Sequence, residues 1–242
     1  MNKYENTYAA INRAVGKAIH RYSMIENGDK ILVALSGGKD SLTLLYALNE
    51  RRLRAPLKYE LFPVFIDLGF EGDIAELLYE YCLQKGFELK VEKTDYGILA
   101  HSDKNRENPC FLCSWQRRKR LFEVAREIGC NKLAFGHNKD DIIETLLINI
   151  FYKGEISTMV PLQFFFKGRF GLIRPLAFVD EAMTKKFSAE QGFPDLVNPC
   201  PSSKRSKRSE IKELLAVLNK RNPKIKGNIL RAMNNVKMDY LL

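Results

Sequence analysis

A hexapeptide of small and polar residues near the N-terminus is the segment best suited to chemistry. It runs Ser36-Gly37-Gly38-Lys39-Asp40-Ser41 and follows the apolar stretch Ile31–Leu35. Adjacent glycines let the backbone turn tightly and approach a ligand without a Cβ in the way. The spacing of leucines after Lys39 predicts a helix, whose first amides and positive dipole end favour a phosphate. The hexapeptide therefore predicts a nucleotide phosphate site between a strand and a helix.

Three of the five cysteines lie in segments bounded by proline. Cys110 and Cys113 form a Cys-x-x-Cys pair in a polar stretch that we expect to be a loop before a helix, and Cys200 stands between two prolines. Three thiolates without an evident fourth ligand suit an iron–sulfur cluster with one iron left open. A zinc site completed by His101 or His137 is the alternative, and cysteines without a metal are the third interpretation. Cys82 and Cys130 are expected in the core.

A pair of carboxylates follows the fourth expected strand. Asp140 and Asp141 belong to the segment Gly136–Thr145, at the start of an expected helix. They could cap free helix amides, or hold Mg²⁺ against nucleotide phosphates because a hard cation prefers carboxylate oxygen. One aspartate is expected to cap and the other to bind the metal.

The elements that position these residues alternate between strand and helix. Near-continuous apolar strands predict an α/β fold with a doubly wound, parallel, five-stranded sheet. In such sheets ligands bind beyond the carboxyl ends of the strands, where Ser36–Ser41, Asp67 and Gly136–Asp141 fall. The expected strands are Ile31–Leu35, Tyr59–Asp67, Glu88–Lys93, Lys132–Gly136 and Leu172–Leu176, and the expected helices are 6–24, 40–52, 73–85, 114–128, 139–151, 207–220 and 223–238.

The segment Tyr152–Gly171 has two interpretations. Its length and glycines favour a lid over the site, and its Lys167-Gly168-Arg169 turn favours a β-hairpin. The two interpretations are compatible, since a β-hairpin can also act as a lid.

The net charge of +10 is concentrated near the C-terminus. Residues 201–242 hold 11 Lys and Arg against three acidic residues. Such a surface attracts a polyanion such as RNA, although a solvated helix face is the simpler alternative. No apolar run approaches the length of a membrane helix and no signal peptide is evident, so we expect a cytoplasmic protein without membrane contact.

Five motifs occur in an order similar to the tRNA 2-thiocytidine synthetase family of PP-loop ATP pyrophosphatases. The resemblance covers about residues 8 to 201, and one departure is Ser203, where the family often has a further cysteine. The motifs are Ser36–Ser41, Pro109–Cys113, Gly136–Thr145, Ile173–Leu176 and Pro199-Cys200.

The resemblance implies an adenine nucleotide α-hydrolase-like fold and an ATP-dependent tRNA sulfurtransferase. ATP would adenylate the C2 oxygen of a tRNA pyrimidine, and sulfur from a 4Fe-4S cluster would then displace AMP. The implied cluster ligands are Cys110, Cys113 and Cys200, and the implied magnesium ligands are Asp40 and Asp141. Lys39, Asp40 and Asp141 would be catalytic. The implied nucleotide-binding residues are Ser36, Gly37, Gly38, Lys39, Asp40, Ser41, Asp67 and Gly136.

The expected partners are tRNA and a sulfur donor, either sulfide or a cysteine desulfurase, with a homodimer as the assembly. Arg117–Arg120 and the basic C-terminal residues would contact the tRNA phosphates, with a merely exposed basic helix face as the alternative for Arg117–Arg120. We expect a PP-loop domain over 1–200 and a basic helical extension over 201–242. Two alternatives remain: an iron–sulfur desulfidase of thiolated bases or small molecules, and a zinc-stabilised nucleotide-binding module.

Overall fold

The computed structural model describes residues 3–196, 199–204 and 207–240 and divides the chain into two compact units. The sheet unit comprises Met1–Asn138 and Val160–Ser203. The helical unit comprises Lys139–Met159 and Lys204–Leu242. These packing units and the domains expected from the sequence are different divisions of the chain, because the segment that begins at Lys139 packs with the C-terminal helices.

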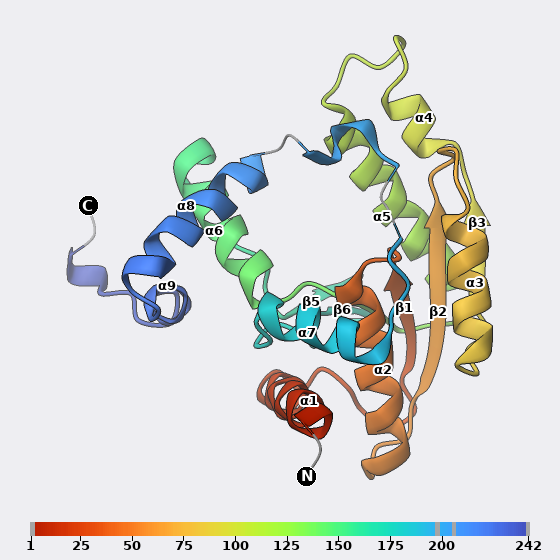
Figure 1. Ribbon diagram of the computed structural model, residues 1–242, viewed down its shortest axis with the longest axis horizontal. Helices are drawn as coiled ribbons and strands as arrows, with labels where there is room; N and C mark the ends of the chain where they lie inside the picture. Colours follow the sequence, from red (N-terminus) through yellow and green to blue (C-terminus); the bar gives the residue numbers. More distant parts are fainter. Residues whose placement is uncertain (1–2, 197–198, 205–206, 241–242) are drawn as a thin grey trace. The chain divides into compact units, whose positions relative to one another are not determined.

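A six-stranded sheet in the order β3-β2-β1-β4-β6-β5 forms the centre of the sheet unit (Figure 1). All neighbours pair in parallel except β5 and β6, which form an antiparallel hairpin. The expected doubly wound α/β sheet is confirmed, with one strand more than predicted. The strands are β1 (Lys30–Leu35), β2 (Glu60–Asp67), β3 (Lys90–Lys93), β4 (Lys132–Phe135), β5 (Leu162–Phe165) and β6 (Phe170–Ile173).

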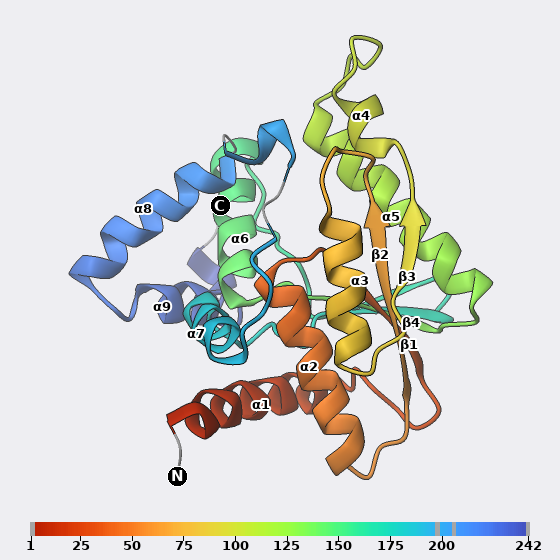
Figure 2. The ribbon, with the colours of Figure 1, turned by 45° about the vertical axis from the view of Figure 1, so that its right-hand side comes forward.

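Helices cover both faces of this sheet, as the apolar strands require. Alternate residues of β1 enter two separate cores, with Ile31 and Val33 in one and Leu32 in the other. The first core includes α1, α2, α3 and α7, and the second includes α5; α3 and α5 lie on opposite sides of β2 in Figure 2. The helices are α1 (Lys3–Arg21), α2 (Lys39–Arg54), α3 (Ile74–Gln84), α4 (Tyr96–Ala100), α5 (Pro109–Glu127) and α7 (Glu181–Gln191), followed by the 3₁₀ helix η1 (Pro201–Lys204).

Helix α5 begins five residues earlier than the sequence suggested. Pro109 occupies its first turn, where the missing proline N–H costs no hydrogen bond, and Asn108 Oδ1 accepts from the backbone N–H of Phe111 at 3.2 Å. The prediction of a loop at Cys110 and Cys113 was therefore wrong, because both lie in the first turns of the helix.

The helical unit has its own small apolar core. Ile143 of one helix packs with Ile211 and Leu215 of another, and Ile225 and Ile229 pack against them. The helices are α6 (Lys139–Lys153), α8 (Lys207–Arg221) and α9 (Ile225–Ala232), with the 3₁₀ helix η2 (Met238–Tyr240) near the end.

The hairpin interpretation of the segment before β6 is confirmed. β5 and β6 are joined by a turn in which Phe166 and Lys167 adopt positive φ. The lid function stays a prediction. Within the described residues, no helix combines the length and apolar character needed to cross a bilayer.

Candidate nucleotide and thiol sites

The hexapeptide forms the turn between β1 and α2. Gly37 has a φ of +77°, a conformation that costs glycine little. Gly38 is the N-cap residue of α2, and no side chain caps it among the described residues. The first amides of the helix are thus presented for an anion at the end of β1.

The two serines of the turn hold its shape. The Ser41 hydroxyl donates to the Gly38 carbonyl at 2.8 Å and accepts the Ser36 backbone N–H at 3.2 Å. Ser41 is buried, while Ser36 is exposed and its Oγ lies 3.3 Å from the Ser41 Oγ. Ser41 therefore stabilises the loop, and Ser36 is placed to meet a ligand.

Gly136, directly after β4, packs against the backbone of this turn. A Cβ at Gly136 would stand 2.9 Å from the Ser41 backbone nitrogen and 3.0 Å from the Asp40 carbonyl carbon. Since β1 and β4 are neighbours at the point where the sheet order reverses, this contact lies at the topological switch point. The expected convergence of Gly136 with the loop is confirmed.

Lys39 and Asp40 are engaged by residues of α7 that the sequence analysis did not single out. The Lys39 ammonium lies 3.1 Å from Asp40 Oδ2 and 3.0 Å from Glu181 Oε1. Burial alone would lower the pKa of Lys39, but the two carboxylates outweigh it and raise that pKa above its usual value. Asp40 Oδ1 accepts hydrogen bonds from the Thr184 hydroxyl at 2.5 Å and from Asn138 at 3.2 Å.

The signal for α7 was present in the sequence. Asp180 precedes the helix as its N-cap residue, and Gly192 ends it in the left-handed conformation. Those are standard start and stop signals. Asp67 stands at the carboxyl end of β2, where its Oδ1 accepts the Gly69 backbone N–H at 2.9 Å, so its carboxylate shapes the turn after the strand.

The three cysteines expected to act together are within electrostatic reach of one another. Burial raises the pKa of the Cys113 thiol, and the thiols of Cys200 and Cys110 raise it further, while Arg117 opposes them. All three belong to the sheet unit, together with the Ser36–Ser41 loop. The structure therefore brings Cys200 to the Cys110/Cys113 pair, although about 87 residues of chain separate it from Cys113.

The two histidines considered as a fourth ligand have other neighbours. His101 Nδ1 lies 2.9 Å from the Gly97 carbonyl oxygen, and its Nε2 lies 2.9 Å from the Ser202 hydroxyl and 3.9 Å from Cys200 Sγ. His137 Nδ1 accepts from the Arg174 guanidinium at 3.3 Å. In the described parts of the chain, no group of three or more His, Cys, Asp or Glu is arranged to enclose a single metal ion.

Asp140 and Asp141 lie in α6 of the helical unit and both pair with basic residues there. Arg208 lies 2.7 Å from Asp141 and 3.3 Å from the buried Glu144, and the Lys226 ammonium pairs with Asp140. Part of the basic charge near the C-terminus is thus used inside the helical unit. A magnesium role for Asp141 stays a prediction.

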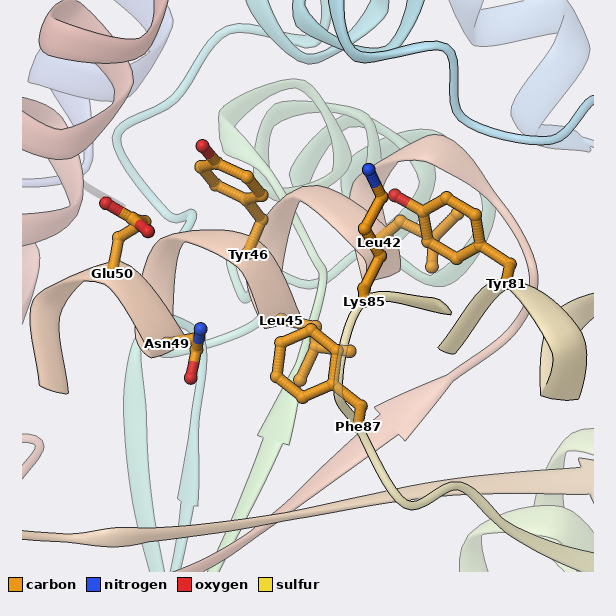
Figure 3. Close-up of a pocket in the computed structure, with 8 residues that line it drawn as sticks. All are labelled: Leu42, Leu45, Tyr46, Asn49, Glu50, Tyr81, Lys85 and Phe87. Carbon is orange, nitrogen blue, oxygen red and sulfur yellow. The ribbon is translucent and has the colours of Figure 1, made fainter. Parts of the chain in front are cut away.

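A small cavity of 160 Å³ in the sheet unit lies elsewhere on α2 (Figure 3). None of the residues expected to bind nucleotide or metal lines it. Its lining consists of Leu42, Leu45, Tyr46, Asn49, Glu50, Tyr81, Lys85 and Phe87.

The fold and the loop define a protein of the PP-loop class. Residues 7–218 match the family model of a PP-loop domain. The chain is 42% identical over 241 residues to a tRNA-cytidine(32) 2-sulfurtransferase of Geotalea uraniireducens, which covers 98% of this chain and 96% of the relative. It is 41% identical to the protein of the same name from Geobacter sulfurreducens, over 97% of this chain and 93% of the relative. The chain belongs to this family of PP-loop tRNA-cytidine sulfurtransferases and is an enzyme.

A solved structure supports the same assignment. The U34-tRNA thiolase NcsA from Methanococcus maripaludis, with its [4Fe-4S] cluster, matches with a TM-score of 0.80 and 28% identity over 99% of this chain and 81% of that chain. An NH3-dependent NAD synthetase from Campylobacter jejuni matches with a TM-score of 0.51 at 13% identity and shows the likeness of fold alone. The likeness to the curated relatives extends beyond residue 201, where the resemblance seen in the sequence ended.

Proposed function

We propose that this protein uses ATP to replace the C2 oxygen of a tRNA cytidine, position 32, with sulfur. One observation carries the proposal: Cys200, whose Sγ lies 3.9 Å from His101 Nε2, comes within electrostatic reach of Cys113 in the unit that also holds the Ser36–Ser41 loop. The names of the relatives at about 40% identity supply the substrate class.

The loop would bind the phosphates of ATP. The first amides of α2, the Ser36 hydroxyl and the Lys39 ammonium are donors for phosphate oxygens. The C2 oxygen would attack the α-phosphorus, so that the bond to pyrophosphate breaks and an adenylated base forms. Lys39, with Mg²⁺ on Asp40 or Asp141, would offset the charge that develops on the departing pyrophosphate.

Asp67 and Gly136 would flank the nucleotide, since both stand at the carboxyl edge of the sheet. Gly136 allows its strand to approach the loop backbone, and Asp67 fixes the turn after β2. In the second half-reaction sulfur forms a bond to C2, and AMP departs with the former C2 oxygen.

The donor set suits a 4Fe-4S cluster held by Cys110, Cys113 and Cys200. The set contains three thiols, the number that ligates a cluster with one iron left open. When bound, such a cluster supplies an iron that can carry the sulfur to be transferred. Arg117, beside Cys113, offsets the negative charge that a thiolate ligand brings.

The remaining partners follow from this chemistry. We infer tRNA as the substrate, sulfide or a cysteine desulfurase as the sulfur donor, a homodimer as the assembly and the cytoplasm as the location. The PP-loop domain would take residues 1–200 and the basic extension 201–242.

Mass spectrometry of tRNA nucleosides tests the proposed function. The full-length protein, reconstituted with iron and sulfide without oxygen, is incubated with ATP, Mg²⁺, sulfide and a tRNA transcript. We expect 2-thiocytidine at position 32 and one pyrophosphate per thiolation. Lys39→Ala should abolish pyrophosphate release. Cys200→Ala should abolish thiolation while ATP binding persists, and Cys130→Ala, whose thiol lies in a core, is the matched cysteine control.

The proposal fails if the loaded protein leaves the transcript unchanged. Loss of sulfur from a thiolated tRNA without ATP would identify a desulfidase instead. A colourless protein that carries zinc after purification without oxygen would identify the nucleotide-binding module.

A further inference from the structure

Two large aromatic side chains stand exposed at the start of α5. Phe111 is 63% exposed and Trp115 is 52% exposed. They are four residues apart in a helix, so their side chains lie on the same side, one turn from the other. Exposure of two large apolar groups side by side is unusual on a surface that meets only water.

The same side of the helix carries positive charge. Arg118 follows Phe111 by two helical turns and is exposed, and the Lys119 ammonium lies 5.7 Å from the centre of the Trp115 ring. Among the described residues no carboxylate pairs with Arg118. Its charge acts instead on two other guanidinium groups. Burial and then Arg118 lower the pKa of Arg174 to about 10, and burial, with a smaller effect of Arg118, lowers the pKa of Arg117.

Arg120, on the same helix, differs from Arg118 because carboxylates surround its guanidinium. Arg120 lies 2.7 Å from Glu92, 3.3 Å from Glu123 and 2.8 Å from Glu127. The expectation that the whole run Arg117–Arg120 contacts RNA stays a prediction, but the charge of Arg120 is already offset by three carboxylates. Lys119 has a looser partner, Glu123 at 3.9 Å, and charge remains unneutralised at Arg118, on the side that bears the aromatic pair.

We propose that Phe111, Trp115, Arg118 and Lys119 form a binding surface for unpaired RNA nucleotides, in which bases stack on the aromatic rings and phosphates pair with the cations. Stacking platforms combined with cations are the usual means of holding single-stranded RNA, because every base has a π-face and every nucleotide a phosphate. The positive charge favours a polyanion over a second copy of this basic protein.

This surface lies on the same turns of α5 that carry the thiols of Cys110 and Cys113. Phe111 lies between Cys110 and Cys113 in the first turns of α5. Residues one and two positions apart in a helix face different directions, so the aromatic rings share these turns with the thiols but not their face. The inference rests on the proposed function for the identity of the RNA as tRNA, and the residues and their geometry define the surface itself.

Trp115 is the single tryptophan of the sequence, so its emission reports on this surface alone. The full-length protein is titrated with a tRNA transcript and with a single-stranded oligoribonucleotide of its anticodon loop. We expect quenching that saturates and that weakens as salt is raised. Phe111→Ala and Trp115→Ala should each weaken binding about tenfold, measured by filter binding, while Trp115→Phe keeps near-parent affinity.

Phe164→Ala is the matched control. Phe164 is 56% exposed in β5, where its ring lies 5.9 Å from the Lys132 ammonium, and its removal should leave RNA affinity unchanged. Tight RNA binding without a change in Trp115 emission, together with parent affinity in both α5 variants, would overturn the proposal. A change of emission with protein concentration in the absence of RNA, matched by sedimentation as a dimer, would show a second copy on this surface and overturn it too.

The two hypotheses fail separately. Thiolation with parent kinetics in Phe111→Ala and Trp115→Ala would remove the RNA surface and leave the proposed function intact. Quenching by RNA in a protein that forms no thiolated nucleoside would rule out the proposed function and leave the RNA surface supported.

Discussion

The His101 imidazole connects Cys200 to the helix that precedes α5. A carbonyl oxygen only accepts hydrogen bonds, so the contact of Nδ1 with the Gly97 carbonyl places the proton on Nδ1. In the neutral ring Nε2 then accepts the Ser202 hydroxyl at 2.9 Å, and Cys200 Sγ lies 3.9 Å from the same atom. His101 thus fixes the turn that carries the third thiol.

His101→Phe should loosen that turn. The ring keeps its volume beside Phe70, but Ser202 and Gly97 lose their hydrogen-bond partner, at a cost of about 1–2 kcal/mol. We expect less iron per chain after reconstitution without oxygen and faster bleaching of the absorption near 400 nm in air. His20→Phe, on the exposed end of α1, is the control. Equal iron content and equal bleaching in both variants would show that His101 does not hold the turn that carries Cys200.

Thr184→Val tests the positioning of Asp40 by α7. Valine keeps the shape of a fully buried threonine but removes the hydroxyl that donates to Asp40 Oδ1. We expect the magnesium concentration needed for half-maximal pyrophosphate release to rise about fivefold, since one hydrogen bond to a charged group is worth about 1.5–3 kcal/mol and is partly replaced by water. ATP-independent RNA binding should not change. A parent magnesium dependence would show that Asp40 needs no support from Thr184.

Gly136→Ala tests the contact between β4 and the loop. The new Cβ would meet backbone atoms of Asp40 and Ser41 rather than a flexible side chain, so the loop itself must shift. We expect a loss of about 1–3 kcal/mol of stability and weaker ATP binding in a fluorescent-nucleotide titration. Gly227→Ala is the control, because nothing lies within 4 Å of its new Cβ and alanine favours the helix α9. Unchanged nucleotide affinity in Gly136→Ala would mean that the contact is dispensable.

The arrangement of the strands was predictable because it depends on local pattern. Buried runs such as Ile31–Leu35, ended by Ser36-Gly37-Gly38, determine where a parallel strand stops and a helix begins. The extra strand β5 was missed because Leu162–Phe165 alternates only weakly and gains its place by pairing with β6. Short apolar segments of that kind take their structure from tertiary partners.

The candidate site was predictable in its residue types more than in its contacts. The three cysteines were identified from their spacing and prolines, whereas Glu181 and Thr184 became visible only through the packing of α7 on α2. Likewise, the surplus of Lys and Arg near the C-terminus did not reveal that Arg208 and Lys226 neutralise carboxylates of α6. Ion pairs between elements distant in sequence leave no periodic signal.

Selective alkylation of the thiols tests the burial of the two core cysteines. Burial raises the pKa of Cys82 to about 11 and that of Cys130 to about 12, so at pH 8 almost no thiolate forms at either residue. In metal-free, folded protein iodoacetamide should modify the exposed Cys110 first and leave Cys82 and Cys130 intact. Peptide mass spectrometry after a time course gives the order. Early modification of Cys82 in protein that remains folded by circular dichroism would contradict its place in the core.

The basic residues of the helical unit should separate into two groups on substitution. Arg208 pairs with Asp141 and with Glu144, which is 2% exposed, so Arg208→Gln leaves a buried carboxylate with less compensation. Because Arg208 itself is partly exposed, we expect a modest loss of about 1–2 kcal/mol in thermal or urea unfolding. Its effect on the salt dependence of tRNA binding should be small, since its charge is already neutralised.

For Lys220 and Arg221 we expect the opposite result: unchanged stability and weaker tRNA binding. Both are exposed in the last turn of α8, and no ion pair engages them among the described residues. The double variant Lys220→Gln/Arg221→Gln should unfold like the parent but weaken tRNA binding, with the slope of log K against log salt shallower by about 1 to 2, because each phosphate contact releases about one counterion. A parent slope in this variant would place these two charges in the solvated surface rather than in contact with RNA. A strong loss of stability would show instead that the two residues support the fold.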